Sequence, residues 1–295
     1  MAPVLALLSA VAYGAADFLG GMAARKATAV AAVVVSQTAG LILLLLALPL
    51  LPETIVNPID IAWGAVAGLA GGSGVALLYR ALALGPMSVV APLTAVFAAA
   101  VPVFTGLALG ERLSMVTTLG IALAAIAIVL IGQEQGPRST VHGPRSTVHG
   151  LRPDVLPSAR SIILSILAGL LVGVFFISLE RTSAASGLWP LVPARVVAIS
   201  LFTASALAGG RPVLVPWSVA WVAVGAGALD MLANALFLIA VQQGPLSVVA
   251  TLASLYPAST IILARIVLRE RWSRLQAAGI ATAVAATVMI VGGIP

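Results

Sequence analysis

Apolar stretches of about twenty residues alternate with short polar breaks along almost the whole chain. A bilayer core about 30 Å thick is crossed by about 20 residues of α-helix, and lipid offers no partners for unpaired backbone groups. The pattern therefore predicts membrane-spanning helices rather than strands. Ten spans are predicted, at residues 4–24, 28–51, 61–84, 87–109, 113–132, 161–180, 187–208, 217–242, 246–268 and 273–293.

The apolar pattern occurs twice in the chain. Residues 85–93 read GPMSVVAPL and residues 244–252 read GPLSVVATL, so seven of nine positions are identical at an offset of 159. The same offset pairs Glu111 with Glu270. Because each copy holds five spans, the second copy enters the membrane from the opposite side, as in the inverted repeats of many secondary transporters. We expect an all-α membrane protein with a first repeat at 1–132, a polar linker at 133–160 and a second repeat at 161–295.

Composition narrows the class of protein further. The chain is 61% hydrophobic and only 8% charged, whereas a soluble domain has about 25% charged residues. There is no cysteine, and both histidines, His142 and His149, lie in a duplicated heptapeptide of the linker. We interpret that segment as a solvated linker rather than a metal-binding tract. The sequence therefore predicts no metal, no cofactor and no nucleic-acid partner, and a lipid bilayer as the surroundings.

The basic residues are distributed unequally between the two membrane faces. Eleven Lys and Arg residues fall on the face where the first span ends, whereas only Arg112 and Arg181 fall clearly on the other. The positive-inside rule would place the first of these faces in the cytoplasm and both termini outside. Arginine far outnumbers lysine, which is typical of a high-GC bacterial genome and favours a bacterial plasma membrane.

A few polar residues inside the spans are the candidates for function, because a charge in hydrocarbon costs at least about 2.5 kcal/mol on insertion scales. Asp230 and Asn234 are four residues apart, so they share a helix face. Arg195 lies at a similar depth in the seventh span. Asp230 is the best candidate for a functional carboxylate; the alternative is an Asp230–Arg195 pair that only stabilises helix packing.

Other embedded residues are weaker candidates. Asp17 and Arg80 lie toward the same side and could pair, in either a structural or a gating role. Phe97 and Tyr256 occupy equivalent positions of the two repeats. The candidate substrate- or ion-binding residues are Asp230, Asn234, Arg195, Asp17, Arg80, Tyr256, Phe97, Tyr13 and Gln37, and no catalytic constellation is predicted. Four prolines are expected to interrupt spans four, seven and nine, namely Pro92, Pro102, Pro193 and Pro257.

Several motifs together resemble a known family. Residues 110–113 read GERL and residues 269–272 read RERW, each opening the last span of a repeat. Residues 13–21 read YGAADFLGG and residues 254–257 read SLYP. Over nearly the whole chain this pattern is similar to the EamA family of the drug/metabolite transporter superfamily, although Arg269 departs from the usual glycine.

The resemblance implies a basket of ten helices, with a central cavity formed by spans 1–4 and 6–9 and with spans 5 and 10 at the periphery. It implies both termini in the cytoplasm, opposite to the charge count. It also implies transport, usually export, of small metabolites such as amino acids. We therefore expect an alternating-access secondary transporter, not an enzyme, as a monomer or homodimer, with a small-molecule substrate and a proton as candidate coupling ion. A passive channel and a non-transporting membrane scaffold are the alternatives.

Overall fold

In this computed structural model the chain is described at residues 1–24, 26–82, 84, 87–132, 158–268 and 273–293. These residues form helices and short turns. The α-helices are α1 (Ala2–Ala24), α2 (Ala29–Ala47), α3 (Pro58–Leu82), α4 (Met87–Ala108), α5 (Met115–Ile131), α6 (Ala159–Glu180), α7 (Leu191–Ala208), α8 (Trp217–Val241), α9 (Leu246–Ala253), α10 (Tyr256–Leu268) and α11 (Arg274–Gly292), and the 3-10 turns are η1 (Leu48–Leu50) and η2 (Ala184–Ser186).

The helices confirm the ten spans expected from the apolar pattern, because α9 and α10 together form the ninth. Among the described residues, eight spans are long and apolar enough to cross a membrane, and α4 and α5 each contribute a shorter apolar stretch, Pro92–Ala108 and Met115–Ile131. Several helices have a serine or threonine N-cap whose hydroxyl accepts a hydrogen bond from a backbone N–H of the first turn. Ser273 accepts a hydrogen bond from the Gln276 backbone at 3.1 Å and the Gln276 side chain returns a bond at 3.0 Å, which forms a capping box for α11.

The prolines interrupt fewer spans than expected. Pro92 and Pro102 lie inside a continuous α4, and Pro193 lies in the first turn of α7, where its missing N–H is no loss. The ninth span alone is broken, between α9 and α10, and Pro257 is the second residue of α10. The expectation was therefore wrong for spans four and seven. A membrane helix can continue through a proline, because neighbouring helices and side chains satisfy the backbone groups that the proline leaves unpaired.

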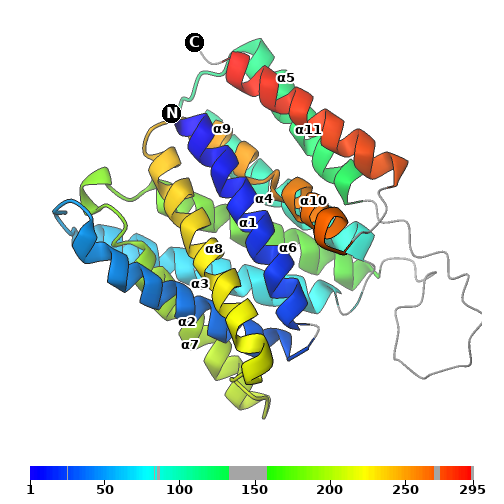
Figure 1. The fold of residues 1–295 in the computed structure, drawn as a ribbon. Helices are drawn as coiled ribbons and strands as arrows, with labels where there is room; N and C mark the ends of the chain where they lie inside the picture. The colour runs from blue at the N-terminus through cyan, green and yellow to red at the C-terminus, as the bar shows by residue number, and fades with distance from the viewer. Residues whose placement is uncertain (25, 83, 85–86, 133–157, 269–272, 294–295) are drawn as a thin grey trace, which may run out of the picture.

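The main helix contacts join the two repeats to each other, so the repeats do not form separate units. Helix α1 packs along α8, and its repeat counterpart α6 packs along α3; likewise α2 packs on α8 as α7 packs on α3. Helices α5 and α11 pair with each other at the edge of the bundle (Figure 1). Each contact thus has a partner related by the repeat, which confirms the two-repeat architecture and the peripheral place of spans five and ten.

Two repeat-related glycines allow the closest of these crossings. A Cβ added to Gly68 in α3 would lie 2.8 Å from the Cα of Ala194 in α7. A Cβ added to Gly227 in α8 would lie 2.9 Å from the Cα of Ser36 in α2. Small residues of this kind let membrane helices approach backbone to backbone.

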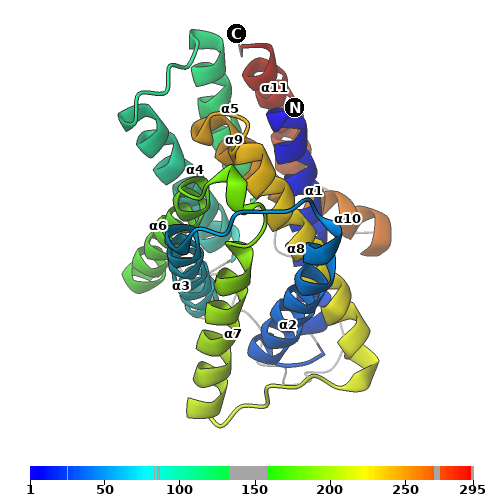
Figure 2. The ribbon, with the colours of Figure 1, turned by 90° about the vertical axis from the view of Figure 1, so that its left-hand side faces the viewer.

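The start of α1 and the end of α11 lie at the same end of the bundle in both views (Figures 1 and 2). We call this end the terminal face. Because successive spans alternate in direction, the terminal face also carries the connections at 48–57, 109–114, 181–190 and 242–245. The connection at 209–216, all of whose residues are described, lies at the opposite face.

Candidate functional site

An ion pair joins the second turn of α7 to the middle of α8. The Nη1 of Arg195 donates to the Oδ2 of Asp230 at 2.5 Å. The Arg195 side chain is only 5% exposed and that of Asp230 is 28% exposed, so the arginine is enclosed while the carboxylate keeps a free edge. The two residues expected to meet at one depth are therefore in direct contact, as an embedded charge requires.

Helix α2 of the first repeat completes the surroundings of this arginine. Nη1 of Arg195 also donates to the Oε1 of Gln37. One turn further along α2, a Cβ added to Gly40 would lie 3.4 Å from the guanidinium carbon, an ordinary contact, and 3.0 Å from the Gly227 carbonyl oxygen, so Gly40 lies beside the guanidinium where α2 approaches the α8 backbone. Nη2 of Arg195 is buried and has no hydrogen-bond partner among the described residues. An unmet buried donor is costly, so an acceptor brought to this point would be bound favourably.

A second chain of contacts runs from α8 to α1 and α10. The Asn234 amide donates to the Asp230 backbone carbonyl at 2.7 Å, and the Tyr13 hydroxyl donates to the Asn234 Oδ1 at 3.0 Å. The Tyr13 ring then meets the Tyr256 ring edge-on, with centroids 6.4 Å apart. Tyr256 stands just after the break in the ninth span, so the break brings an aromatic ring to these polar groups.

We call the six connected side chains the polar network. They come from α1 and α2 of the first repeat and from α7, α8 and α10 of the second. The members are Gln37, Arg195, Asp230, Asn234, Tyr13 and Tyr256.

Asp17 lies one turn beyond Tyr13 on α1, beside the polar network. It is close enough to Asp230 and Tyr256 to interact electrostatically with both. Its side chain is exposed, and within the described residues no hydrogen bond or ion pair holds it. The pair with Arg80 is absent, since among the described residues no ion pair joins Asp17 to Arg80, and Arg80 is exposed near the end of α3. Helices α1 and α3 each pack mainly on a helix of the other repeat, which separates these two charges.

Phe97 does not share the surroundings of its repeat counterpart Tyr256. A Cβ added to Gly169 of α6 would lie 2.6 Å from the Phe97 Cβ, so Phe97 packs in the α4–α6 contact. No contact between Phe97 and the polar network is among those of the described residues. In the described part of the chain, no group of three or more His, Cys, Asp or Glu side chains lies close enough to hold a metal ion.

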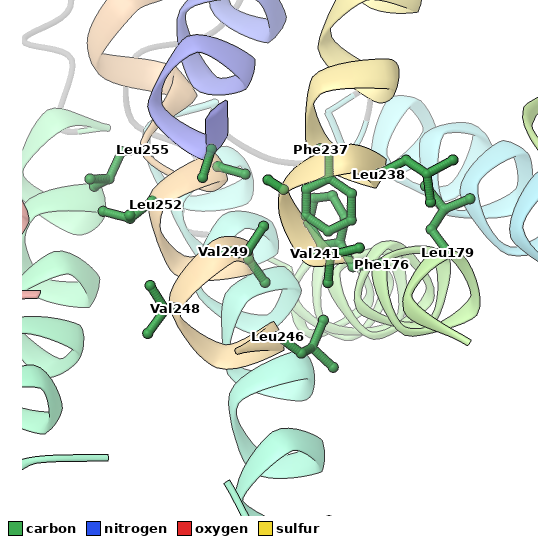
Figure 3. Close-up of a cluster of buried hydrophobic side chains, with 14 of the residues drawn as sticks. Phe176, Leu179, Phe237, Leu238, Val241, Leu246, Val248, Val249, Leu252 and Leu255 are labelled. Atoms are coloured by element: carbon green, nitrogen blue, oxygen red, sulfur yellow. The ribbon is translucent and has the colours of Figure 1, made fainter. Parts of the chain in front are cut away.

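A buried apolar cluster, which we call the apolar plug, follows the polar residues of α8 toward the terminal face. Phe176 and Phe237 stack with ring centroids 4.4 Å apart, each about one turn before the terminal-face end of its helix. Figure 3 shows them within the buried cluster, together with side chains that follow on α8 and α9. The plug consists of Phe176, Leu179, Phe237, Leu238, Val241 and Leu246, all of which are buried. It was not foreseen from the sequence, although Phe176 is the repeat counterpart of Asp17.

Two carboxylates at the terminal face also join the repeats, and neither was recognised from the sequence as a functional candidate. Asp60 of α3 is 1% exposed and accepts from the Ser183 N–H at 3.1 Å and from the Ser186 hydroxyl at 2.6 Å. Glu111 accepts from the Leu246 N–H at 2.6 Å, at the first turn of α9. For Glu111 the signal was its recurrence as Glu270 within a repeated motif. Asp60 has no acidic counterpart in the second repeat, so the repeat offered no such signal.

These features define a multi-pass membrane protein with a polar site enclosed between two repeats, the architecture of a membrane transporter. The model of the EamA-like transporter family matches residues 1–133 and 159–292, so the chain belongs to the EamA-like transporter family, which is a family of transporters and not of enzymes. One solved crystal structure, described only as that of a protein, is 15% identical and covers 98% of this chain and 95% of its own, with a TM-score of 0.76. That likeness concerns the fold. Among curated proteins, no relative matches significantly.

Proposed function

We propose that this protein is a secondary transporter that exports small metabolites such as amino acids across a bacterial plasma membrane by alternating access. The observation that carries the proposal is the polar network, which side chains of both repeats build, with the buried apolar plug beyond it on α8 toward the terminal face. A site at the repeat interface that is closed toward one face is what alternating access requires.

The charges of the network favour a substrate that carries both signs. The unmet Nη2 of Arg195 suits a carboxylate, which forms strong charge-assisted hydrogen bonds with a guanidinium. The partly exposed carboxylate of Asp230 suits an ammonium group. The aromatic rings of Tyr13 and Tyr256 supply apolar contact beside these charges. An amino acid presents all three features in a small volume.

For energy coupling we propose a proton carried by Asp17. Asp230 is held by Arg195, whereas Asp17 has no such partner among the described residues and is exposed. The groups that face Asp17 are Asp230 on α8, Tyr256 on α10 and Tyr13 on its own helix. A proton on Asp17 removes the repulsion between the two carboxylates, and substrate binding then depends on whether that proton is present.

The proposal includes the division of the chain into a first repeat at 1–132, a linker at 133–160 and a second repeat at 161–295. It also includes a monomer or homodimer as the transporting unit. We propose the orientation typical of the family, with both termini in the cytoplasm. A cytoplasmic-type reporter fused after Pro295 should be active. Activity of a periplasmic-type reporter at the same point would instead support the orientation given by the charge count.

The substrate class is tested by thermal-shift measurements of the purified protein against a library of the common amino acids, followed by uptake of each hit into proteoliposomes. We expect at least one amino acid to raise the melting temperature and to be transported, and Asn234→Leu to abolish both effects. A library without any hit would contradict the proposed substrate class.

The alternatives predict other results. A passive channel would show flux that follows the substrate gradient without acceleration by substrate on the far side. A scaffold would bind no metabolite and show no flux. Unmatched polar residues in the two repeats, such as Asp230 opposite Gly71, argue against a purely structural duplication.

A further inference from the structure

The connection between α4 and α5 reaches across to the other repeat at the terminal face. Helix α4 ends at Ala108, and Gly110 follows with a φ of 94°, a left-handed conformation that glycine adopts without strain. The turn folds back so that the Glu111 N–H donates to the Gly106 carbonyl at 3.0 Å. The Glu111 side chain is therefore aimed back over the end of α4.

The carboxylate of Glu111 receives three hydrogen bonds from the first turn of α9. Oε1 accepts from the Leu246 N–H at 2.6 Å, and Oε2 accepts from the Ser247 N–H at 3.2 Å and from the Ser247 hydroxyl. A negative charge at a helix start also complements the helix dipole. We call this set of contacts the Glu111 clasp.

The position of the clasp connects the terminal face to the polar network. Every residue of α9 is buried, and α9 is followed after two residues by Tyr256, whose ring contacts the network. Leu246, which the clasp holds, is itself part of the apolar plug. Moving the start of α9 therefore loosens the plug.

The sequence around the clasp is adapted to hold the carboxylate in this place. A Cβ added to Gly106 would lie 2.6 Å from the Glu111 carboxyl carbon, so only glycine leaves the required space. This is the reason for the glycine two residues before the end of α4. It also offers a way to displace the carboxylate without removing its charge.

We propose that the Glu111 clasp is a gate: it holds the terminal face closed in this conformation and releases α9 when the transport site opens to that face. The proposal rests on the proposed function, since a gate matters only for a carrier that opens alternately to its two sides. It goes beyond that function by naming the contact that must break.

The gate is tested with a single cysteine placed in the plug, because the natural chain contains no cysteine. The reporter is Val241→Cys, since Val241 is 6% exposed and of similar size. Its rate of reaction with a maleimide in detergent measures how often the plug opens. The measurement needs neither substrate nor transport.

We expect Glu111→Gln to accelerate labelling about tenfold, because the amide places a donor opposite the Ser247 N–H and removes a charge-assisted bond. Gly106→Ala should have a similar effect, since it displaces the carboxylate sterically. The matched control is Glu53→Gln, which changes an exposed glutamate of the same face. Ser247→Ala removes only the hydroxyl donor and serves if the stronger variants do not fold.

Unchanged labelling in Glu111→Gln, Gly106→Ala and Ser247→Ala, with the folded state verified by gel filtration, would overturn the gate. Accelerated labelling in a protein that transports nothing would instead leave the gate standing and contradict the proposed function. In a transporting protein, Glu111→Gln should change the maximal rate while leaving the KM for the substrate within about twofold, since the clasp does not touch the network.

Discussion

Arg195 and Asp230 form a 2.5 Å ion pair between α7 and α8, and each replaces a small residue of the other repeat, Ser36 and Gly71. The pair therefore exists only in one of two otherwise similar half-sites. Because Arg195 also binds Gln37, the pair joins the second repeat to the first. The site therefore carries a charged pair from the second repeat, and the pseudo-two-fold axis relates this pair to two uncharged residues of the first repeat.

Neutralising one partner should destabilise the fold, because the other charge remains buried. For Asp230→Asn we expect a loss of about 3 kcal/mol in the free energy of unfolding, the lower end of the range for broken buried pairs, since Asp230 is partly exposed. Chemical denaturation in detergent measures this loss. The double variant Arg195→Met/Asp230→Leu should recover stability without recovering transport. Recovered transport in the double variant would show that the pair serves packing alone.

The Tyr13–Asn234 hydrogen bond can be tested by removing a single oxygen. Tyr13→Phe leaves the Asn234 Oδ1 without its donor, which should cost about 1 kcal/mol in stability or in substrate binding. A melting-temperature series with and without the substrate separates the two effects. Phe97→Leu changes an aromatic residue of the same repeat that packs against α6 outside the polar network, so it serves as the comparison and should leave substrate affinity unchanged.

Gly227 and Gly225, two residues apart on α8, offer a paired test of helix packing. A Cβ at Gly227 would meet the backbone of Ser36, so Gly227→Ala should cost about 1–3 kcal/mol through overpacking. A Cβ at Gly225 would meet only the Leu19 Cδ1 at 3.4 Å, an ordinary contact, so Gly225→Ala should be tolerated. Equal stability of the two variants, measured by thermal unfolding, would show that the α2–α8 crossing is looser than described.

The proposed coupling role of Asp17 separates two modes of transport. Asp17→Asn should abolish substrate movement driven by a pH gradient, because the amide binds no proton in this range, while exchange of substrate for substrate continues. Both are measured in the same proteoliposomes with an imposed pH difference. Undiminished pH-driven transport by Asp17→Asn would assign the coupling ion to another group.

Much of the fold was predictable because lipid imposes strict rules on length and composition. The ten spans and the two repeats follow from apolar runs and from the repeated motifs, whereas the basket arrangement and the peripheral place of spans five and ten were implied by the resemblance. The break after Ala253 was signalled by Pro257, but the same reasoning failed for Pro92 and Pro102, because a lone proline does not reveal whether neighbours support the helix.

The site was predictable only in part. Asp230, Asn234 and Arg195 could be grouped because charge in hydrocarbon demands partners at one depth. Asp17 and Arg80 satisfied the same depth rule and yet do not pair, since depth carries no information about which helices are neighbours. Glu111 and Asp60 were missed as functional residues because their partners are backbone N–H groups and hydroxyls, which leave no charge pattern in the sequence.

The most direct test of the account is counterflow in proteoliposomes loaded with an unlabelled amino acid identified by the thermal-shift screen. The account predicts that labelled amino acid enters faster and transiently accumulates when the inside is loaded, and that Asn234→Leu removes the effect. Entry that is indifferent to internal substrate would indicate a channel, and the absence of specific entry would indicate a scaffold; either result would contradict alternating access at the polar network.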